Sequence, residues 1–474
     1  MRRAGKIILC VIVLLIAAVL WARWSAPPWP ERLPHVQLEP TRPILRPDQV
    51  SPDNAFYYIR EMTNFAGLPR MGDATNEYER FKALGWSKGS YTQLEAIVAA
   101  DTEAFAMYRK AADMERCQLV TMNSFTCLVP YVSVVLEKSR ALCFEAEWAA
   151  GRGDWRTAAR DFRAVLRIGD HLTRGGAVID CLVGCAGKAM ACYSLGRVAA
   201  QGNPPKRFFR DRIQELLESD QNTEPFAEMI RYERLAGQDA IRMFSEGDVW
   251  ELLSLSGGSQ EKARLMKRLA RAGLLKNTPA HFDAVYSHII AHASAPYAAD
   301  DSFMRVVPPI QVRNPVKQFG VLMDDPIGRI LINLIIPALD QCRERYVGTQ
   351  AIVRGMALFL AVRAYQADHR GTLPDKLAAL VPDYLDALPE DPFAKNQAPF
   401  LYAVSGEAWT IYSVGPNQQD DQGQYDWGNK EEKSRYRDRL DICFSPERFE
   451  RDRDAFLEGK AAAHADTHQS SDSH

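Results

Sequence analysis

The stretch RERYVGTQAIVRGMALFLAVRAYQAD, residues 343–368, predicts a long helix with one apolar face. Two aromatic and β-branched segments follow, PFLYAV at 399–404 and AWTIYSV at 408–414, and the three residues between them predict a β-hairpin. The segment RLDICF at 439–444 predicts a third strand. We therefore expect an α+β unit in which the helix packs on three short antiparallel strands. Most of the apolar helix face comes from Ile352, Met356, Phe359, Leu360 and Tyr365.

Glycine and proline set the boundaries after this helix. Gly371 is the expected C-terminal stop, and Leu373-Pro374 is the expected start of a short helix that holds Leu377 and Leu380. Further upstream, the apolar stretch 327–339 is too short to span a bilayer comfortably, so we expect it to be a buried core helix.

The N-terminal segment predicts a membrane anchor at 1–24. Positive residues at 2, 3 and 6 precede an apolar run from 7 to 22, and Trp21 and Trp24 suit the membrane interface. The positive charges favour a cytoplasmic N-terminus, so the bulk of the chain is expected on the periplasmic side of a single-pass inner-membrane protein. A cleaved signal peptide is the alternative, although the bulky residues before Ala26 make a poor cleavage site.

Length and composition indicate two or three domains with ordinary cores. The chain has 474 residues, of which 47% are apolar and 25% charged, and its net charge is −2. One basic amphipathic cluster, 262–276, is typical of a solvated helix face or of a helix on an anionic membrane surface. No nucleic-acid-binding motif accompanies it, so we expect no nucleic-acid partner.

The predicted organisation is mainly α-helical. A proline-rich segment at 25–50 is expected to be an extended spacer, since proline disfavours helices and central strands. A multi-helix domain of helical hairpins is expected at 51–325, with Ser51 as the first N-cap and Pro52 at the first helical position. The α+β module then covers 326–444, and a polar, disordered tail with weak metal affinity covers 445–474.

One helix pair has a recognisable pattern at 142–165, LCFEAEWAAGRGDWRTAARDFRAV. Its small Ala146, its Gly153-Asp154 turn and the following Trp155, Ala158 and Phe162 resemble a single tetratricopeptide repeat. Small residues permit close helix approach, and the aromatic residues fill the remaining gap. No second copy follows at the 34-residue period, so we expect one hairpin and not a solenoid.

The C-terminal quarter of the chain resembles the major pseudopilin of type II secretion systems. The resemblance implies a pilin-like α+β fold, although the N-terminal processing site of pseudopilins is missing. The arrangement as a whole also resembles membrane-anchored helical envelope proteins of planctomycete-type bacteria. The matching residues, in order, are Tyr365, Gly371, Pro374, Asp391, Pro392, Tyr402, Ser413, Gly415, Asp441 and Ile442.

The resemblance further implies a calcium site in the acidic loop after Ser413. Calcium takes six to eight hard oxygen ligands, which Asp, Asn and backbone carbonyls supply. Two alternatives remain open, a solvated acidic turn and pairing of the carboxylates with the basic residues at 430–439. The candidate metal residues are Asp420, Asp421, Asp441, Asn417 and Ser413, the last through nearby backbone carbonyls, and Asp426 is also available.

Other candidate sites have weaker patterns. His288 and His292 share a helix face but have no third zinc ligand in the sequence pattern. Cys181 and Cys185 are also four residues apart, a spacing that rarely permits a disulfide, so we expect small buried residues. Lys188 ends the segment GCAGK, which is a fragment of a phosphate loop, and we expect it to mark close helix packing. The pair Cys117 and Cys127 is spaced to close a loop in an oxidising compartment.

These features lead to a functional hypothesis without a catalytic constellation. We expect a non-enzymatic, membrane-anchored envelope protein with a structural or protein-interaction role, accessory to a secretion or pilus-like system. The alternative is an enzyme with a pocket among the central helices, around His281, Asp283, His288 and His292. A cytoplasmic scaffold is a third possibility if the anchor inserts the other way.

Overall fold

The computed structural model describes residues 36–85, 90–120, 129–246, 278–297, 326–424 and 441–449. The predicted anchor at 1–24, the basic cluster at 262–276, Cys127 and most of the tail lie outside these residues. The helices are α2 (Ala55–Glu61), α3 (Thr75–Leu84), α4 (Thr92–Ala100), α5 (Thr102–Asp113), α6 (Tyr131–Gly151), α7 (Trp155–Leu172), α8 (Val178–Gln201), α9 (Lys206–Gln221), α10 (Phe226–Glu246), α13 (Thr278–Ala293) and α16 (Pro326–Asp368). The strands are β1 (Leu401–Ser405), β2 (Ala408–Ser413) and β3 (Ile442–Phe444), and short 3₁₀ turns include η1 (Pro47–Gln49), η5 (Leu377–Leu380) and η6 (Lys395–Gln397).

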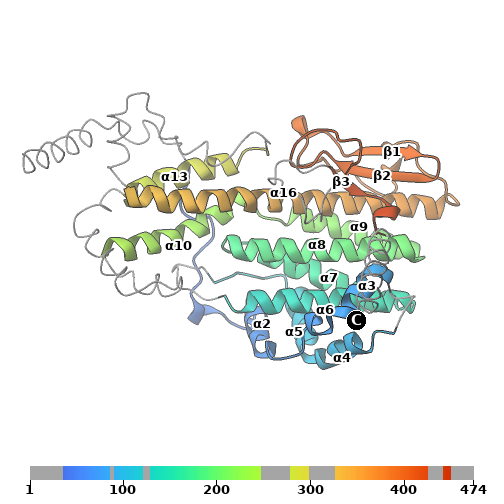
Figure 1. Cartoon of the computed structure of the whole chain (residues 1–474), viewed down its shortest axis with the longest axis horizontal. Coiled ribbons are helices and arrows are strands. Elements are labelled where there is room, and N and C mark those ends of the chain that lie inside the picture. The colour runs from blue at the N-terminus through green and yellow to red at the C-terminus, as the bar shows by residue number, and fades with distance from the viewer. Residues whose placement is uncertain are drawn as a thin grey trace, which may run out of the picture.

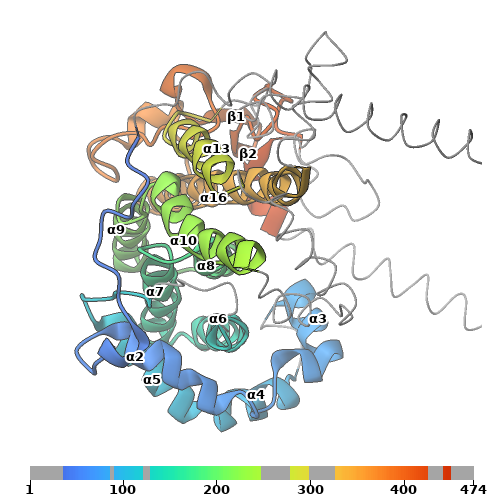
Figure 2. The same cartoon turned by 90° about the vertical axis from the view of Figure 1, so that its left-hand side faces the viewer.

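The described elements stack in layers around α16 (Figure 1). The small sheet covers one face of α16, and α8 and α9 cover the opposite side. Beneath them lie α6 and α7, followed by α2 and α5 (Figures 1 and 2). The buried apolar residues form one cluster that runs through all these layers, so the sheet shares its core with the helices. The prediction of a mainly α fold with a small three-stranded antiparallel sheet is confirmed.

Helix α16 is longer than the sequence predicted. The expected core helix at 327–339 and the expected helix from 343 to 368 are one continuous helix of 43 residues. The division into two helices was wrong, since the helix runs without interruption from Pro326 to Asp368 and includes Pro337. Gly371 follows the end of the helix and stops it as predicted. Its N–H donates to the carbonyl of Gln366 at 2.8 Å, and its φ is 88°.

The predicted helical hairpin at 142–165 is present as the adjoining parts of α6 and α7. Gly153 has a φ of 78°, and the carboxylate of Asp154 caps α7 by accepting the Thr157 N–H at 3.1 Å. Ala146 and Phe162, from the two helices, are both fully buried. The local sequence therefore sets the turn, and small and aromatic residues build the interface, as expected.

Helices α7 and α8 approach each other through glycine, which confirms the packing interpretation of GCAGK. A Cβ atom added to Gly184 would lie 2.7 Å from the carbonyl oxygen of Gly169. Cys181 and Cys185 lie on the same helix with their sulfur atoms 3.9 Å apart, and both are buried free thiols. Burial raises the pKa of the Cys181 thiol. Cys117 is also a free cysteine.

The predicted helix start at Ser51-Pro52 was wrong by three residues. Helix α2 begins at Ala55, and the Asn54 side chain caps it by accepting the Phe56 N–H at 3.1 Å. The Ser51 hydroxyl instead donates to the carboxylate of Asp53, so it is not available to the helix. Local sequence did not distinguish these two capping residues.

The described half of the proline-rich segment, 36–50, does not act as a free spacer. The backbone N–H of Thr41 donates to the Glu228 carboxylate of α10 at 2.6 Å, and the guanidinium group of Arg231 donates to the Gln37 carbonyl at 2.8 Å. The segment is extended except for the short η1 turn, but it lies along α10 as a strap and not as a linker away from the helices.

The sheet has the order β1-β2-β3 with both pairs antiparallel. Its hairpin turn is Gly406-Glu407, one residue shorter than predicted, because β1 extends to Ser405. The predicted short helix holding Leu377 and Leu380 is present as the single turn η5. Each strand is within about two residues of its predicted position where the structure describes it.

Two helices in the described residues, α8 and the 339–368 part of α16, are long and apolar enough to cross a membrane by composition. They are 67% and 83% buried inside the protein over their most apolar windows, which is typical of core helices.

Candidate functional site

The centre of the α+β module is the carboxylate of Asp391, in the Asp-Pro-Phe turn before the sheet. Asp391 is 2% exposed, and its carboxylate accepts three hydrogen bonds: from the Ser413 hydroxyl at 2.7 Å, the Val414 N–H at 2.9 Å and the Phe393 N–H at 3.0 Å. Burial raises the pKa of Asp391, although these donors partly offset it. The side chain therefore joins the turn to the end of β2.

The second buried carboxylate, Asp441, holds the acidic loop to the start of β3. Asp441 is fully buried and accepts the Gly423 N–H at 2.8 Å and the Asp421 N–H at 3.4 Å. Burial raises its pKa to about 6, and the nearby Asp421 and Asp420 add to the shift, whereas the two backbone donors lower it. Asp441 is thus close to the loop from which the sequence predicted calcium ligands.

The remaining predicted calcium ligands are occupied by hydrogen bonds. The Asn417 amide donates to Asp421 at 2.8 Å, and the Gln422 N–H donates to the Asp420 carboxylate at 2.9 Å. The Ser413 hydroxyl donates to Asp391 and not toward the loop. The oxygen types suit calcium, but the described residues contain no group of three or more His, Cys, Asp or Glu side chains arranged to hold a metal ion. Asp426 and the basic residues at 430–439 lie outside the described part of the chain.

Sequence reasoning gave no role to Gln418, which fixes the other end of this loop. Its φ is 57°, and its side-chain amide donates to the Phe393 carbonyl at 2.6 Å and to the Tyr297 carbonyl at 3.2 Å. These bonds connect the loop to the Asp391 turn and to the residues after α13. No local pattern identifies such a contact, because its partners are distant in sequence.

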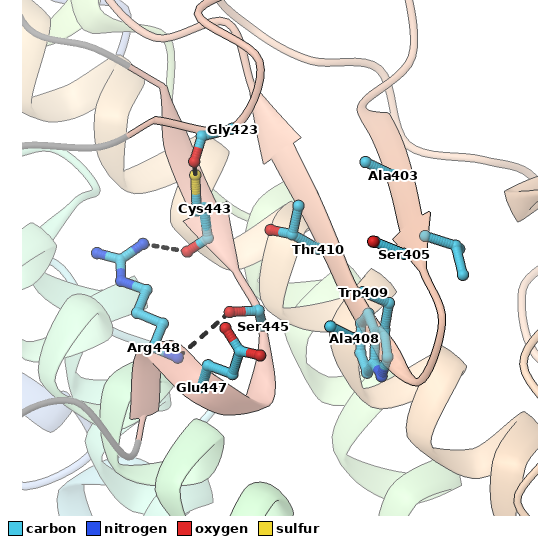
Figure 3. A pocket seen from close by; sticks show the side chains of 11 residues that line it. Ala403, Ser405, Ala408, Trp409, Thr410, Gly423, Cys443, Ser445, Glu447 and Arg448 are labelled. Carbon is cyan, nitrogen blue, oxygen red and sulfur yellow. Dashed lines mark hydrogen bonds between the residues drawn. The ribbon is translucent and has the colours of Figure 1, made fainter.

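A shallow pocket of about 230 Å³ lies on the outer face of the sheet (Figure 3). Small residues on the three strands, such as Ala403 and Thr410, line it, and the turn after β3 closes one side. Its polar groups bond to one another: the Cys443 thiol donates to the Gly423 carbonyl at 3.1 Å, and the Arg448 N–H donates to the Ser445 hydroxyl oxygen at 3.2 Å.

The residues of the alternative enzyme hypothesis all lie on α13. Asp283 forms an ion pair with Arg234 of α10 at 3.0 Å, and burial lowers the pKa of His288. His281 is 8% exposed. Together with His292, these residues do not form a metal-binding group in the part of the chain that the structure describes. Helix α13, which carries all four residues, packs against α10 and α16.

A buried ion pair that sequence reasoning missed joins α7, α8 and α9. The Lys188 ammonium group lies 2.8 Å from the carboxylate of Asp170, and both side chains are 2% exposed. Lys188 also donates to the Thr223 hydroxyl oxygen at 2.7 Å, and the Ser219 hydroxyl donates to Asp170 at 2.6 Å. The only available sequence signal was a lysine within the small-residue run at 184–188. These contacts make the pair a structural connection between three helices.

Comparison with known proteins gives no further guide to the site. No family model, curated protein or solved structure matches this chain.

Proposed function

We propose that the protein is a non-enzymatic, membrane-anchored envelope scaffold that binds other proteins. The observation that supports this is the shared helix α16, whose two sides carry the sheet and the α8–α9 layer. Arg354 of α16 donates to Asp220 of α9 at 2.8 Å and to the Glu390 carbonyl at 2.9 Å, so one side chain connects both sides. A rigid unit of this kind presents fixed surfaces to partners.

The C-terminal turn adds a second connection between the sheet and the helices. Arg448 donates to the Tyr193 hydroxyl of α8 at 3.2 Å, and its guanidinium carbon lies 5.3 Å from the ring centre. Phe449 packs against Gly196 of α8 and against Phe359 of α16. Within the proposal, the module does not assemble as a separate pilin subunit but is held on a helical base.

The membrane setting of the proposal comes from the sequence. Three positive residues before an apolar run, flanked by two tryptophans, favour a single-pass anchor with the bulk of the chain on the periplasmic side. Protease added to intact spheroplasts should then digest the chain down to the anchor. Protection of the bulk of the chain would contradict this orientation and favour a cytoplasmic scaffold.

The specific form of the proposal is an accessory role in a secretion or pilus-like system. It rests on the ordered resemblance of the C-terminal quarter to the major pseudopilin of type II secretion, and on the agreement between the expected and observed helix and strands. Calcium binding belongs to the same resemblance and requires the acidic loop to rearrange so that Asp420, Asp421 and Asp441 converge on one ion. Affinity purification of the tagged full-length protein from detergent-solubilised membranes tests the scaffold role directly.

A further inference from the structure

Strand β1 forms a free edge of the sheet. The sheet order β1-β2-β3 gives β1 a neighbour on one side only, and the bridge between Glu390 and Pro399 ends before β1 begins. Within the described residues, no hydrogen bond reaches the backbone of β1 from its outer side. Figure 3 shows Ala403 and Ser405 of β1 on the opposite side of the sheet from Cys443 of β3. The edge of β1 is therefore open to another strand.

The hairpin fixes which backbone groups point outward along this edge. Its two-residue turn, Gly406-Glu407, closes on Ser405 and Ala408, and the closing residues of such a hairpin bond to each other. Bonded and non-bonded pairs alternate along an antiparallel ladder. The N–H and C=O groups of Tyr402 and Val404 therefore point away from β2, toward the open edge.

The two edges of the sheet differ in how they are protected. The same alternation points the Cys443 carbonyl outward on β3, and the Arg448 guanidinium group donates to it. Strand β1, with the sequence LYAVS, has no charged residue, proline or bulge, which are the usual features that keep an edge strand from pairing. Val404 is 48% exposed, although it lies opposite Trp409, which stacks on Phe359 of α16. The apolar face of the sheet is thus incompletely covered at this edge.

We propose that β1 pairs with β1 of a second copy of this chain, antiparallel and across a two-fold axis at Ala403. In this register Tyr402 lies opposite Val404 of the second copy, and their outward backbone groups exchange hydrogen bonds. The Tyr402 ring then covers the exposed Val404 of the second copy, and such aromatic and β-branched pairs stabilise sheets. A two-fold interface must be complementary to itself, and this register places no like charges opposite each other.

The size of the interface indicates how strong this pairing is. An edge of 5 residues buries far less area than the roughly 1,200 Å² of a standard protein interface, so free chains associate weakly. Two copies anchored in one membrane have a higher effective concentration and pair at a lower affinity. The register follows from the sheet alone, whereas the extent of pairing rests on the membrane anchor of the proposed function.

Cysteine cross-linking of the full-length protein in membranes tests the register. Ala403 lies opposite its own copy in a non-hydrogen-bonded pair, whose Cα atoms are about 4.5 Å apart and within disulfide range. Ser405 is exposed on the same face of β1, but its two copies lie about 14 Å apart along the strands. Under mild oxidation, Ala403→Cys should give roughly tenfold more disulfide-linked dimer than the matched control Ser405→Cys. The wild type measures the background from the native cysteines.

A charge at Val404 tests the pairing itself. In the Ala403→Cys background, Val404→Lys places two lysines diagonally across the axis and should lower the dimer yield by roughly fivefold or more. The control Val404→Thr keeps the β-branched shape and should cross-link like its parent. Both variants should fold, because Val404 is half exposed.

Three results would overturn the inference: equal dimer yields from Ala403→Cys and Ser405→Cys, an unchanged yield in Val404→Lys, or cross-linking of Ala403→Cys to a different protein in place of its own copy. The last result would indicate that β1 accepts a strand from another partner. Failure of the pairing is also distinguishable from failure of the proposed function. A chain found in the soluble fraction contradicts the membrane anchor, whereas preferred cross-linking of Ala403→Cys in concentrated purified protein still supports the pairing.

Discussion

The ring of Phe444 in β3 packs directly on Gly355 of α16, so closely that a Cβ atom at position 355 would overlap the ring. Gly355→Ala should therefore destabilise the protein by about 1–3 kcal/mol, because the sheet must move away from the helix. Chemical denaturation measures this change. Gly187→Ala is the matched control in α8, where the nearest atom would lie 3.9 Å away, and it should be neutral or stabilising. Equal effects of both substitutions would refute the close contact.

The buried Lys188–Asp170 pair gives a second prediction. Lys188→Met should cost about 3–5 kcal/mol of unfolding free energy, because it leaves the buried Asp170 carboxylate with only the more distant Arg167, at 3.9 Å, as a cation. The double variant Asp170→Leu/Lys188→Met should recover much of that loss, since both charges are removed. Urea denaturation of the four proteins gives the coupling energy. Additive losses would show that the pair is not coupled.

His171 predicts the direction of one pH effect. It is fully buried, its Nε2 lies 3.1 Å from the Ala111 carbonyl oxygen, and burial lowers its pKa to about 4. The unfolded chain gains a proton near pH 6.5 while the folded chain stays neutral, so the contribution of His171 to stability falls as the pH decreases from 6.5 to 4. Relative to His171→Gln, the wild type should lose on the order of 3 kcal/mol over that range. A pH-independent difference would contradict the burial of a neutral imidazole.

Asp391 is expected to be the most sensitive polar residue of the module. Asp391→Ala leaves the donors of Phe393, Ser413 and Val414 without their acceptor, and each unpaired buried donor costs about 1–3 kcal/mol. Ser413→Ala removes one of the three bonds and should cost less. Thermal unfolding ranks the two variants, and the reverse order would show that Asp391 does not organise the turn.

The calcium prediction is testable through Asp441. If the acidic loop binds calcium, the ion raises the melting temperature above that in EDTA, because it neutralises a buried carboxylate whose pKa is raised to about 6. Asp441→Asn should abolish the difference. Identical melting curves in calcium and EDTA would count against the calcium site. The loop would then be held to Asp441 by the hydrogen bonds from the Gly423 and Asp421 N–H groups.

Without calcium, Asp441 has the opposite pH behaviour to His171. The folded carboxyl holds its proton up to about pH 6 and the unfolded carboxyl only up to about pH 4, so its contribution to stability is greatest in acid and is lost as the pH rises through 6.

Sequence periodicity predicted the long helix, the hairpin and the helix pair at 142–165, because each depends on residues that are close in the chain. The continuity of α16 was not predicted, because the apolar stretch 327–339 and the amphipathic stretch 343–368 have different sequence patterns although they form one helix. The same holds for the strap along α10, where Thr41 and Glu228 are distant in sequence.

In the candidate sites, too, features set by residues close in the chain were predicted and features set by distant contacts were not. The pseudopilin resemblance implied that Asp441 and Asp421 lie near each other as calcium ligands, and the Asp421 N–H does donate to the Asp441 carboxylate at 3.4 Å. The role of Gln418 and the ion pair of Lys188 depend on tertiary contacts that no local spacing records.

The most direct measurement of the central claim is quantitative mass spectrometry of proteins that co-purify with the C-terminally tagged, full-length protein from detergent-solubilised membranes. The scaffold account predicts stable recovery of envelope proteins at near-stoichiometric amounts. Recovery of the tagged protein alone, or with soluble metabolic enzymes only, would contradict it.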